Sequence, residues 1–278
     1  LQSQKDVPIL NLNTSRLSEL KLRRNGSSMA VCRRREGRDS MICGNCPKCF
    51  AFGKWCSGCS GCHRLFKNCS PGRLCGSCHF VCPDRPGLEA YINRHLHGTL
   101  ELEPISVKQC IELPEHLPLV ATRLFETLPL ESAPWAAVHT AKMPSKVWSF
   151  GLVREHYGLS GETKTVLGFY SPDRVLEQFW LRRGERYEMI KKEFDAAFAP
   201  NFSVYDDAPR MEHIFNMRRS NMVAAEMAAY GVAVIPDIGW YNKEDLDRWA
   251  EFTAKSNIGA VAFSFQTVGR SSKSRAVW

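Results

Sequence analysis

Long apolar runs are missing from this 278-residue chain. No stretch approaches the roughly 18 to 20 apolar residues that a membrane helix needs, which argues against a membrane partner. The N-terminus also lacks the charged-then-apolar pattern of a secretory signal, so we expect a cytoplasmic protein. With 44% hydrophobic and 24% charged residues, the composition is that of an ordinary globular protein. The length allows one large or two moderate domains, and the oligomeric state stays open.

Acidic residues are scarce in the first hundred positions. This part has 6 Asp and Glu against 16 Lys and Arg, whereas residues 101–278 have 23 against 21. The excess positive charge therefore belongs to the N-terminal third, where Arg33, Arg34 and Arg35 adjoin Cys32. These cations either balance metal–thiolate charge or contact a polyanion. We expect nucleic acid as the partner, with the three arginines as candidate binding residues, and DNA is not distinguished from RNA.

Apolar residues are too few between positions 43 and 82 to build a core, because ten cysteines occupy this segment. Two sets of these cysteines recur at intervals of thirteen residues, and the first two repeats each read C-x2-C-x2-C. Two thiolates at this spacing can chelate one tetrahedral ion from a tight turn. We therefore predict a metal-binding module over residues 41–90, after a basic leader at residues 1–40. The expected metal ligands are Cys43, Cys46, Cys49, Cys56, Cys59, Cys62, Cys69, Cys75, Cys78 and Cys82.

Three chemistries compete for these thiols. Disulfides suit small secreted domains, which nothing else in the sequence favours. Zinc suits the repeated C-x2-C pairs and is the favoured cofactor. An iron–sulfur cluster is the alternative, because Cys75-x2-Cys78-x3-Cys82-Pro83 matches the end of the bacterial ferredoxin run. In that run Gly72 stands where the first cysteine would be.

From about residue 115 the pattern changes to apolar strands that alternate with amphipathic helices. The strands are nearly continuous in apolar residues, as expected for a parallel sheet that is covered on both faces. This predicts an α/β domain over residues 115–278, with fewer strands than the eight of a closed barrel, so that it is either an incomplete TIM-barrel-like domain or an open sheet. The expected strands are Ala136–Thr140, Val166–Tyr170, Ala196–Tyr205, Val232–Ile238 and Ala260–Thr267, with a possible sixth in Pro118–Phe125.

Helix boundaries follow from local signals. Asn242 is expected to cap a helix over Lys243–Ala254. Asp207 and Pro209 predict the start of a long helix that Gly231 ends. Three polar residues of that helix are expected to be solvated at the surface or to form a salt bridge. They are Arg218, Arg219 and Asn221.

Function in such folds gathers at the carboxyl ends of the strands. Asp206 and Asp237 are carboxylates at these ends and are our candidate catalytic residues. Trp240, Tyr205 and His139 are expected to line a pocket there, with Trp240 as a wall for a ring or base. Acids are common at strand ends, so a purely structural role is the alternative. A glycosidase-like hydrolase would need its two carboxylates about 5 to 10 Å apart.

A resemblance joins these residues. The stretch Asn201–Pro209, the helix residues Asn216 and Arg218, the stretch Gly231–Pro236 and Trp240 together resemble an uncharacterised domain family of bacteria, plasmids and phages. The resemblance covers about residues 115–270. It brings no assigned activity, but it implies a mobile genetic element, an intracellular setting and a task related to nucleic acid.

The combined hypothesis is an intracellular metal-binding protein of a mobile element, associated with nucleic acid. It would carry a cysteine-rich zinc module on a β/α domain with an acidic pocket. Two alternatives remain: an iron–sulfur redox protein or enzyme that uses the module as an electron relay, and a carboxylate-dependent hydrolase. Whether the domain is an enzyme stays open.

Overall fold

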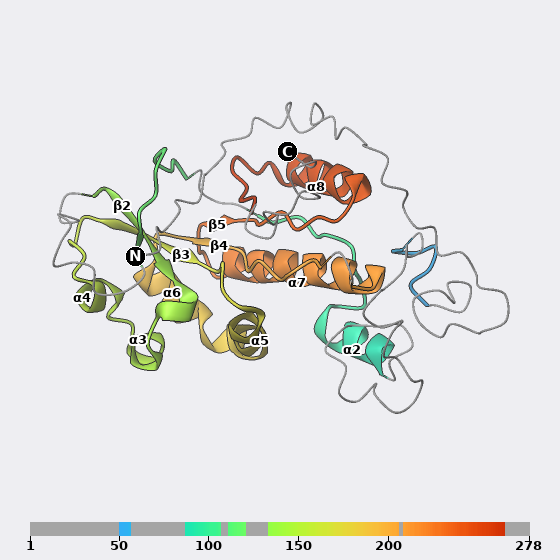
Figure 1. Cartoon of the computed structure of the whole chain (residues 1–278), viewed down its shortest axis with the longest axis horizontal. Coiled ribbons are helices and arrows are strands. Elements are labelled where there is room, and N and C mark those ends of the chain that lie inside the picture. The colour runs from blue at the N-terminus through green and yellow to red at the C-terminus, as the bar shows by residue number, and fades with distance from the viewer. Residues whose placement is uncertain (1–49, 57–86, 107–110, 121–132, 206–207, 265–278) are drawn as a thin grey trace, which may run out of the picture.

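A five-stranded parallel sheet is the centre of the computed structural model, which describes residues 50–56, 87–106, 111–120, 133–205 and 208–264 (Figure 1). The strand order is β1-β2-β3-β4-β5, and every neighbouring pair is parallel. This confirms the predicted α/β class. The strands are β1 (Leu119–Val120), β2 (Trp135–His139), β3 (Lys164–Gly168), β4 (Ala196–Phe198) and β5 (Val234–Ile235).

Helices connect the strands in the order that the sequence pattern predicts. The α-helices are α2 (Leu88–His95), α3 (Ser145–Phe150), α4 (Val153–Tyr157), α5 (Asp173–Arg182), α6 (Tyr187–Glu193), α7 (Arg210–Ala229) and α8 (Lys243–Ser256). The short 3-10 turns are η5 (Thr140–Lys142) and η6 (Arg183–Glu185). None of the helices that the structure describes is long and apolar enough to cross a membrane.

A sixth strand position lies beside β5. Ala262 forms a parallel bridge with Asp237, in which Ile238 N–H donates to the Ala262 carbonyl and Ala262 N–H donates to the Pro236 carbonyl, both at 2.8 Å. The chain therefore returns next to β5 after α8. This sequential order is the order of neighbouring strands in one wall of a β/α barrel, whereas a doubly wound sheet reverses direction.

The two faces of the sheet differ. Alternate strand residues such as Ala136, Val138 and Leu167 belong to a large core with buried residues of α2 to α8. The opposite face has a smaller cluster that includes Ala137 and Val166, and its described members come only from strands and loops. Side chains alternate across a strand, so within each strand the residues two positions apart point to the same face. Helices thus cover one face, as in a barrel wall.

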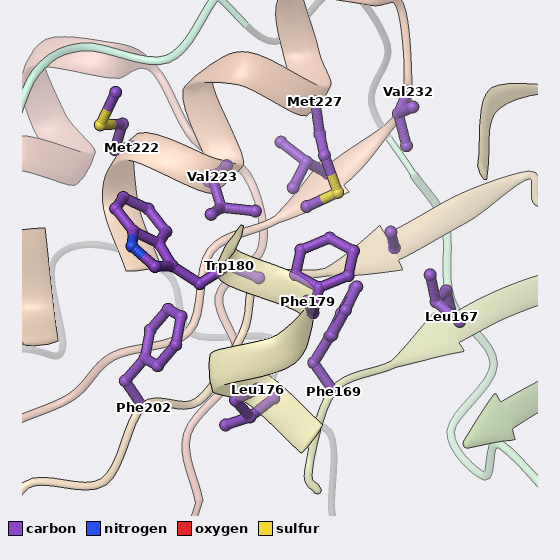
Figure 2. Packing of buried hydrophobic residues seen from close by; sticks show 14 of the residues in the cluster. Leu167, Phe169, Leu176, Phe179, Trp180, Phe202, Met222, Val223, Met227 and Val232 are labelled. Atoms are coloured by element: carbon purple, nitrogen blue, oxygen red, sulfur yellow. The ribbon is translucent and has the colours of Figure 1, made fainter. Parts of the chain in front are cut away.

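Aromatic packing joins α5 to the segments that follow β3 and β4 on the covered face (Figure 2). Phe179 packs edge-to-face on Phe169 with ring centroids 4.6 Å apart, and Trp180 packs edge-to-face on Phe202 at 6.2 Å. Figure 2 shows Val223 of α7 above Trp180. Aromatic pairs in this geometry add to the stabilisation from burial, so they help to hold α5 against the sheet.

The local helix signals work as predicted at α8 and at the end of α7. Asn242 caps α8: its side chain accepts from Asp245 N–H at 3.1 Å, and Asp245 completes a capping box. Gly231 follows α7 with φ 88°, a conformation that favours glycine. Pro209 precedes Arg210, the first residue of α7, and Asp207 lies outside the described residues.

The polar residues of α7 are buried, so the expectation of surface solvation was wrong for them. Arg218 is fully buried and forms an ion pair with Glu103 at 3.2 Å. Asn221 exchanges two hydrogen bonds of 3.0 Å with the backbone of Glu103. Arg219 pairs with Glu177 at 2.8 Å. The alternative that we gave, a salt bridge, is correct for both arginines, because a buried guanidinium requires compensating acceptors.

Candidate functional site

Asp237 lies at the carboxyl edge of the sheet, two residues after the last residue of β5. It lies two residues after Ile235 and therefore points to the same face as Ile235, on which the described cluster contains no helix residue. His139 is the last residue of β2 and lies two residues after Ala137, so its side chain points to the same face as Ala137. Tyr170 lies four residues after Val166 and belongs to the same cluster. Three different strands thus present polar side chains on one face at one edge.

Hydrogen bonds join these residues around Asp237. Its side chain is buried, with the residue only 2% exposed. The Tyr170 hydroxyl donates to Asp237 Oδ2 at 2.8 Å, and the Asn201 side chain donates a second hydrogen bond. Both donors are neutral, so they orient the carboxyl without supplying a compensating positive charge.

The environment raises the pKa of Asp237 to about 7. Burial is the largest cause, because it disfavours the charged carboxylate. The hydrogen bonds from Tyr170 and Asn201 act in the opposite direction and lower the pKa, but by less than burial raises it. A carboxyl with this pKa can both accept and donate a proton near neutral pH, which is the requirement for general acid or base chemistry.

Tyr170 stays protonated over the same range. Burial raises the pKa of its hydroxyl well above the usual value, and the charge of Asp237 raises it further. Tyr170 therefore acts as a hydrogen-bond donor to Asp237 and not as an anion.

His139, the last residue of β2, contacts the backbone of Tyr170. Its Nδ1 accepts a hydrogen bond from Ala141 N–H at 3.2 Å, and its ring also bonds to the backbone of Tyr170. Burial lowers the pKa of His139, and the charge of Lys142 lowers it further, while the bond to Tyr170 opposes them. The His139 ring is therefore neutral at neutral pH, and it lies next to Tyr170, which donates to Asp237.

An aromatic pair lies on the chain segments next to Asp237. Trp240 stacks on Phe263 with centroids 5.9 Å apart and an interplanar angle of 24°. Trp240 comes three residues after Asp237, and Phe263 follows Ala262 on the sixth strand position. The Trp249 indole N–H donates to the Gly239 carbonyl at 2.7 Å and holds this loop against α8.

Tyr205 has a different partner. Its hydroxyl donates to Asp173 at the start of α5, and the Ser203 hydroxyl donates to the other oxygen of the same carboxylate at 2.7 Å. Close by, the hydroxyls of Thr140 and Ser171 form a hydrogen bond with one another. The carboxyl edge thus carries two polar groups, one around Asp237 and one around Asp173.

Several predicted site residues lie outside the described residues: Asp206, the three arginines at 33–35 and every proposed ligand except Cys56. Cys56 lies near the first residue of α7. Its sulfur contributes to the raised pKa of Arg210: burial lowers this pKa, but hydrogen bonding and charge from Asp245 raise it, and the charge of Cys56 adds to them. Within the ranges that the structure describes, no group of three or more potential ligands could hold a metal ion.

Two contacts of the site were not predicted. Tyr170 was predicted to end the strand Val166–Tyr170, whereas β3 ends at Gly168 and Tyr170 follows it by two residues. Asn201 was predicted inside the strand Ala196–Tyr205 and begins the stretch that carries the family resemblance, but β4 ends at Phe198 and Asn201 lies beyond it. Its contact with Asp237 depends on how far apart the two strand ends lie in space, which no local pattern encodes.

The fold and site define a β/α domain with a buried carboxyl of raised pKa at the carboxyl edge of its sheet. The chain belongs to the family described as a domain of unknown function, DUF4417, which matches residues 134–278. It is also 29% identical over 100 residues to the "Gene 1 protein" of Mycobacterium phage D29, a match that spans 36% of each chain. Of the predicted resemblance to an uncharacterised domain family of bacteria, plasmids and phages, the uncharacterised family and the phage association are confirmed. No solved structure matches.

Proposed function

We propose that this chain is an intracellular, nucleic-acid-associated metalloprotein of a phage or related mobile element. Its β/α domain would use Asp237 as a general acid or base on a bound planar ring. Its cysteine-rich module would bind zinc. The phage relative and the family match support the context.

The observation that carries the acid–base role is the environment of Asp237. A carboxyl that is 2% exposed, has a pKa of about 7 and, among the described residues, receives neutral donors is poorly suited to a structural ion pair. It is suited to proton transfer, and it lies at the edge of the sheet where β/α enzymes gather their catalytic groups. Tyr170 would orient the Asp237 carboxyl through its hydroxyl, and His139 would hold the backbone of Tyr170 in place.

A nucleobase is the ligand class that fits these side chains. The stacked pair of Trp240 and Phe263 offers aromatic faces for a planar ring. Asp237 and Asn201 offer an acceptor and a donor that complement the polar edge of a base. The cationic N-terminal third, with Arg33, Arg34 and Arg35, would hold the phosphate backbone.

Protonation of Asp237 can be measured without a substrate. Carboxyl-13C aspartate labelling of the full chain, with Asp237→Asn to assign the signal, gives the titration midpoint by NMR. We expect a midpoint near pH 7. A midpoint below pH 5 would mean that the carboxyl is ionised throughout the neutral range and would exclude the proposed role.

Nucleic-acid association is tested with fluorescein-labelled 20-mer single strands of DNA and of RNA. We expect binding by the full chain to weaken steeply with salt and to fall more than tenfold in R33A/R34A/R35A. The matched control, K191A/K192A/K255A, removes three exposed cations from α6 and α8. Equal losses in both triple variants would point to net charge alone and refute a specific role for the arginines.

The metal is identified by elemental analysis after anaerobic purification. A colourless protein with zinc supports the proposal, whereas a brown protein with iron and sulfide would favour the redox alternative. A fully reduced chain that binds neither metal would refute the metalloprotein assignment.

A further inference from the structure

The second polar group at the carboxyl edge consists of one carboxylate and four hydroxyls. We call it the Asp173 group, and its members are Thr140, Ser171, Asp173, Ser203 and Tyr205. The Ser203 hydroxyl donates to Asp173 Oδ1 at 2.7 Å, and the Tyr205 hydroxyl donates to Oδ2. The hydroxyls of Thr140 and Ser171 bond to one another. The group therefore joins the segments that follow β2, β3 and β4 to the first residue of α5.

The chain places the Asp173 group beside the residues around Asp237. Thr140 directly follows His139, and Ser171 directly follows Tyr170. Tyr170 in turn donates to Asp237 Oδ2 at 2.8 Å. Consecutive Cα atoms lie about 3.8 Å apart, so the two groups are neighbours at two successive strand ends. This is also the relation between the two parts of a nucleoside, in which the base is bonded directly to the sugar.

The chemistry of the Asp173 group suits a neutral polyol. Asp173, Ser203 and Tyr205 are each only partly buried, so solvent reaches them. Within the described residues, the donors to the Asp173 carboxylate are neutral hydroxyls, and a carboxylate without a cation repels a phosphate. An ionised carboxylate has about four lone-pair sites, of which these two donors use two. A sugar hydroxyl can donate to a remaining site and accept from a serine or tyrosine hydroxyl.

We propose that the Asp173 group is a ribose-binding subsite, so that the ligand of the Asp237 site is a ribonucleoside unit and not a deoxyribonucleoside. This inference rests on the proposed binding of a nucleobase next to Asp237. The Asp173 carboxylate accepts a hydrogen bond from the ribose 2′-hydroxyl, which is the group that distinguishes RNA from DNA. A carboxylate on this hydroxyl is also how dinucleotide-binding folds hold a ribose. A deoxyribose leaves the carboxylate without that donor.

A comparison of ribonucleosides with their 2′-deoxy counterparts tests the subsite in the unaltered full chain. Adenosine, guanosine, cytidine and uridine, and the four 2′-deoxy forms, are titrated into protein labelled with carboxyl-13C aspartate. NMR follows the Asp173 and Asp237 signals, which Asp173→Asn and Asp237→Asn assign. We expect at least one ribonucleoside to shift both signals. Its 2′-deoxy counterpart should bind at least about tenfold more weakly, because a charged acceptor loses its donor.

Variants show whether the Asp173 group supplies this preference. Asp173→Asn removes the charged acceptor and should lower the ratio of ribonucleoside to deoxyribonucleoside affinity to less than about threefold. Tyr205→Phe keeps the carboxylate but removes one hydroxyl that orients it, so it should lower the ratio by a smaller factor. Asp247→Asn makes the same charge change at an exposed position of α8 and should keep the wild-type ratio. A purely structural role of Asp173 would lower stability and leave the ratio unchanged.

The outcomes separate the ribose subsite from the proposed function. Equal affinity for a ribonucleoside and its deoxy counterpart, both shifting the Asp237 signal, would overturn the subsite and leave the base site intact. A wild-type ratio in Asp173→Asn would also overturn the subsite. If Asp173→Asn does not fold, the wild-type ratio and Tyr205→Phe decide. No shift of Asp237 by any of the eight nucleosides would refute the nucleobase ligand, and the subsite with it.

A last arm identifies the source of the ribonucleoside. The same labelled protein is titrated with a 20-mer of RNA and with a 20-mer of DNA of the same sequence. A shift of the Asp173 signal by the RNA supports recognition of a nucleotide within a strand. A shift by free ribonucleosides without one by the RNA supports a free nucleoside as the ligand. A shift of the Asp173 signal by the DNA as large as that by the RNA would overturn the subsite.

Discussion

Asp237 and Asp245 are both buried, but their hydrogen-bond donors differ in charge. Asp245 is fully buried and meets the Arg210 guanidinium through two hydrogen bonds, in addition to backbone N–H donors. Asp237 is also buried, and the donors to it within the described residues are the hydroxyl of Tyr170 and the amide of Asn201. A full positive charge compensates a buried carboxylate, whereas neutral donors compensate it in part. Asp245 therefore joins α8 to Arg210 of α7, whereas Asp237 has the raised pKa on which the proposed proton transfer depends.

Asp245→Asn should have the largest effect on stability. It leaves Arg210 buried without its counter-charge, and breaking such a pair typically costs about 3 to 5 kcal/mol. Urea unfolding at pH 7 measures this loss. If Asp237→Asn destabilised the chain as much as Asp245→Asn, the distinction between the two aspartates would be lost.

The second-largest effect should be a pH dependence of stability that is caused by Asp237. The folded state holds the Asp237 proton up to about pH 7, whereas the unfolded chain releases it near pH 3.8. Between these values the folded state binds more protons, so stability falls as pH rises, by at most roughly 4 kcal/mol. His139 acts oppositely, because its lowered pKa makes the folded state bind fewer protons. The difference between wild type and Asp237→Asn isolates the aspartate.

We expect Asp237→Asn to gain stability relative to the wild type between pH 4 and pH 7 and to keep this gain at pH 8. Thermal unfolding at half-unit steps of pH measures it. A difference that does not change with pH would show that Asp237 has an ordinary pKa in the folded protein.

Tyr170→Phe should have a smaller effect that depends on pH. It removes a donor that favours the carboxylate, so the pKa of Asp237 should rise further. The loss of stability should be about 1 to 3 kcal/mol at pH 8 and less at pH 5, where the carboxyl is protonated. Equal losses at both pH values would mean that the hydroxyl contributes packing and not carboxylate binding.

Asp247→Asn is the exposed counterpart and should have the smallest effect. Its ion pair with Lys243 lies at the surface of α8, with the Asp247 side chain 63% exposed. Solvent screens such pairs, so we expect a change below about 0.5 kcal/mol in the same urea experiment. A loss comparable to that of Asp245→Asn would show that burial does not separate the two sites.

The sequence determined the α/β class, the approximate strand positions, the capping of α8 by Asn242 and the end of α7 at Gly231. These features depend on short-range periodicity and on backbone preferences of single residues, which a local pattern contains. The cationic N-terminal third and the thiol repeat are likewise properties of the sequence itself. They predict metal and nucleic-acid chemistry that the described residues do not test.

Only the tertiary structure decided which polar groups meet. Tyr170 and Asp237 are 67 positions apart, and their contact exists because two strands end at the same edge of one sheet. Arg218 has the sequence context of a surface residue, but residues 87–106 pack over α7 and bury it. Burial and long-range pairing depend on the whole fold, and they set the pKa of Asp237 on which the proposed chemistry depends.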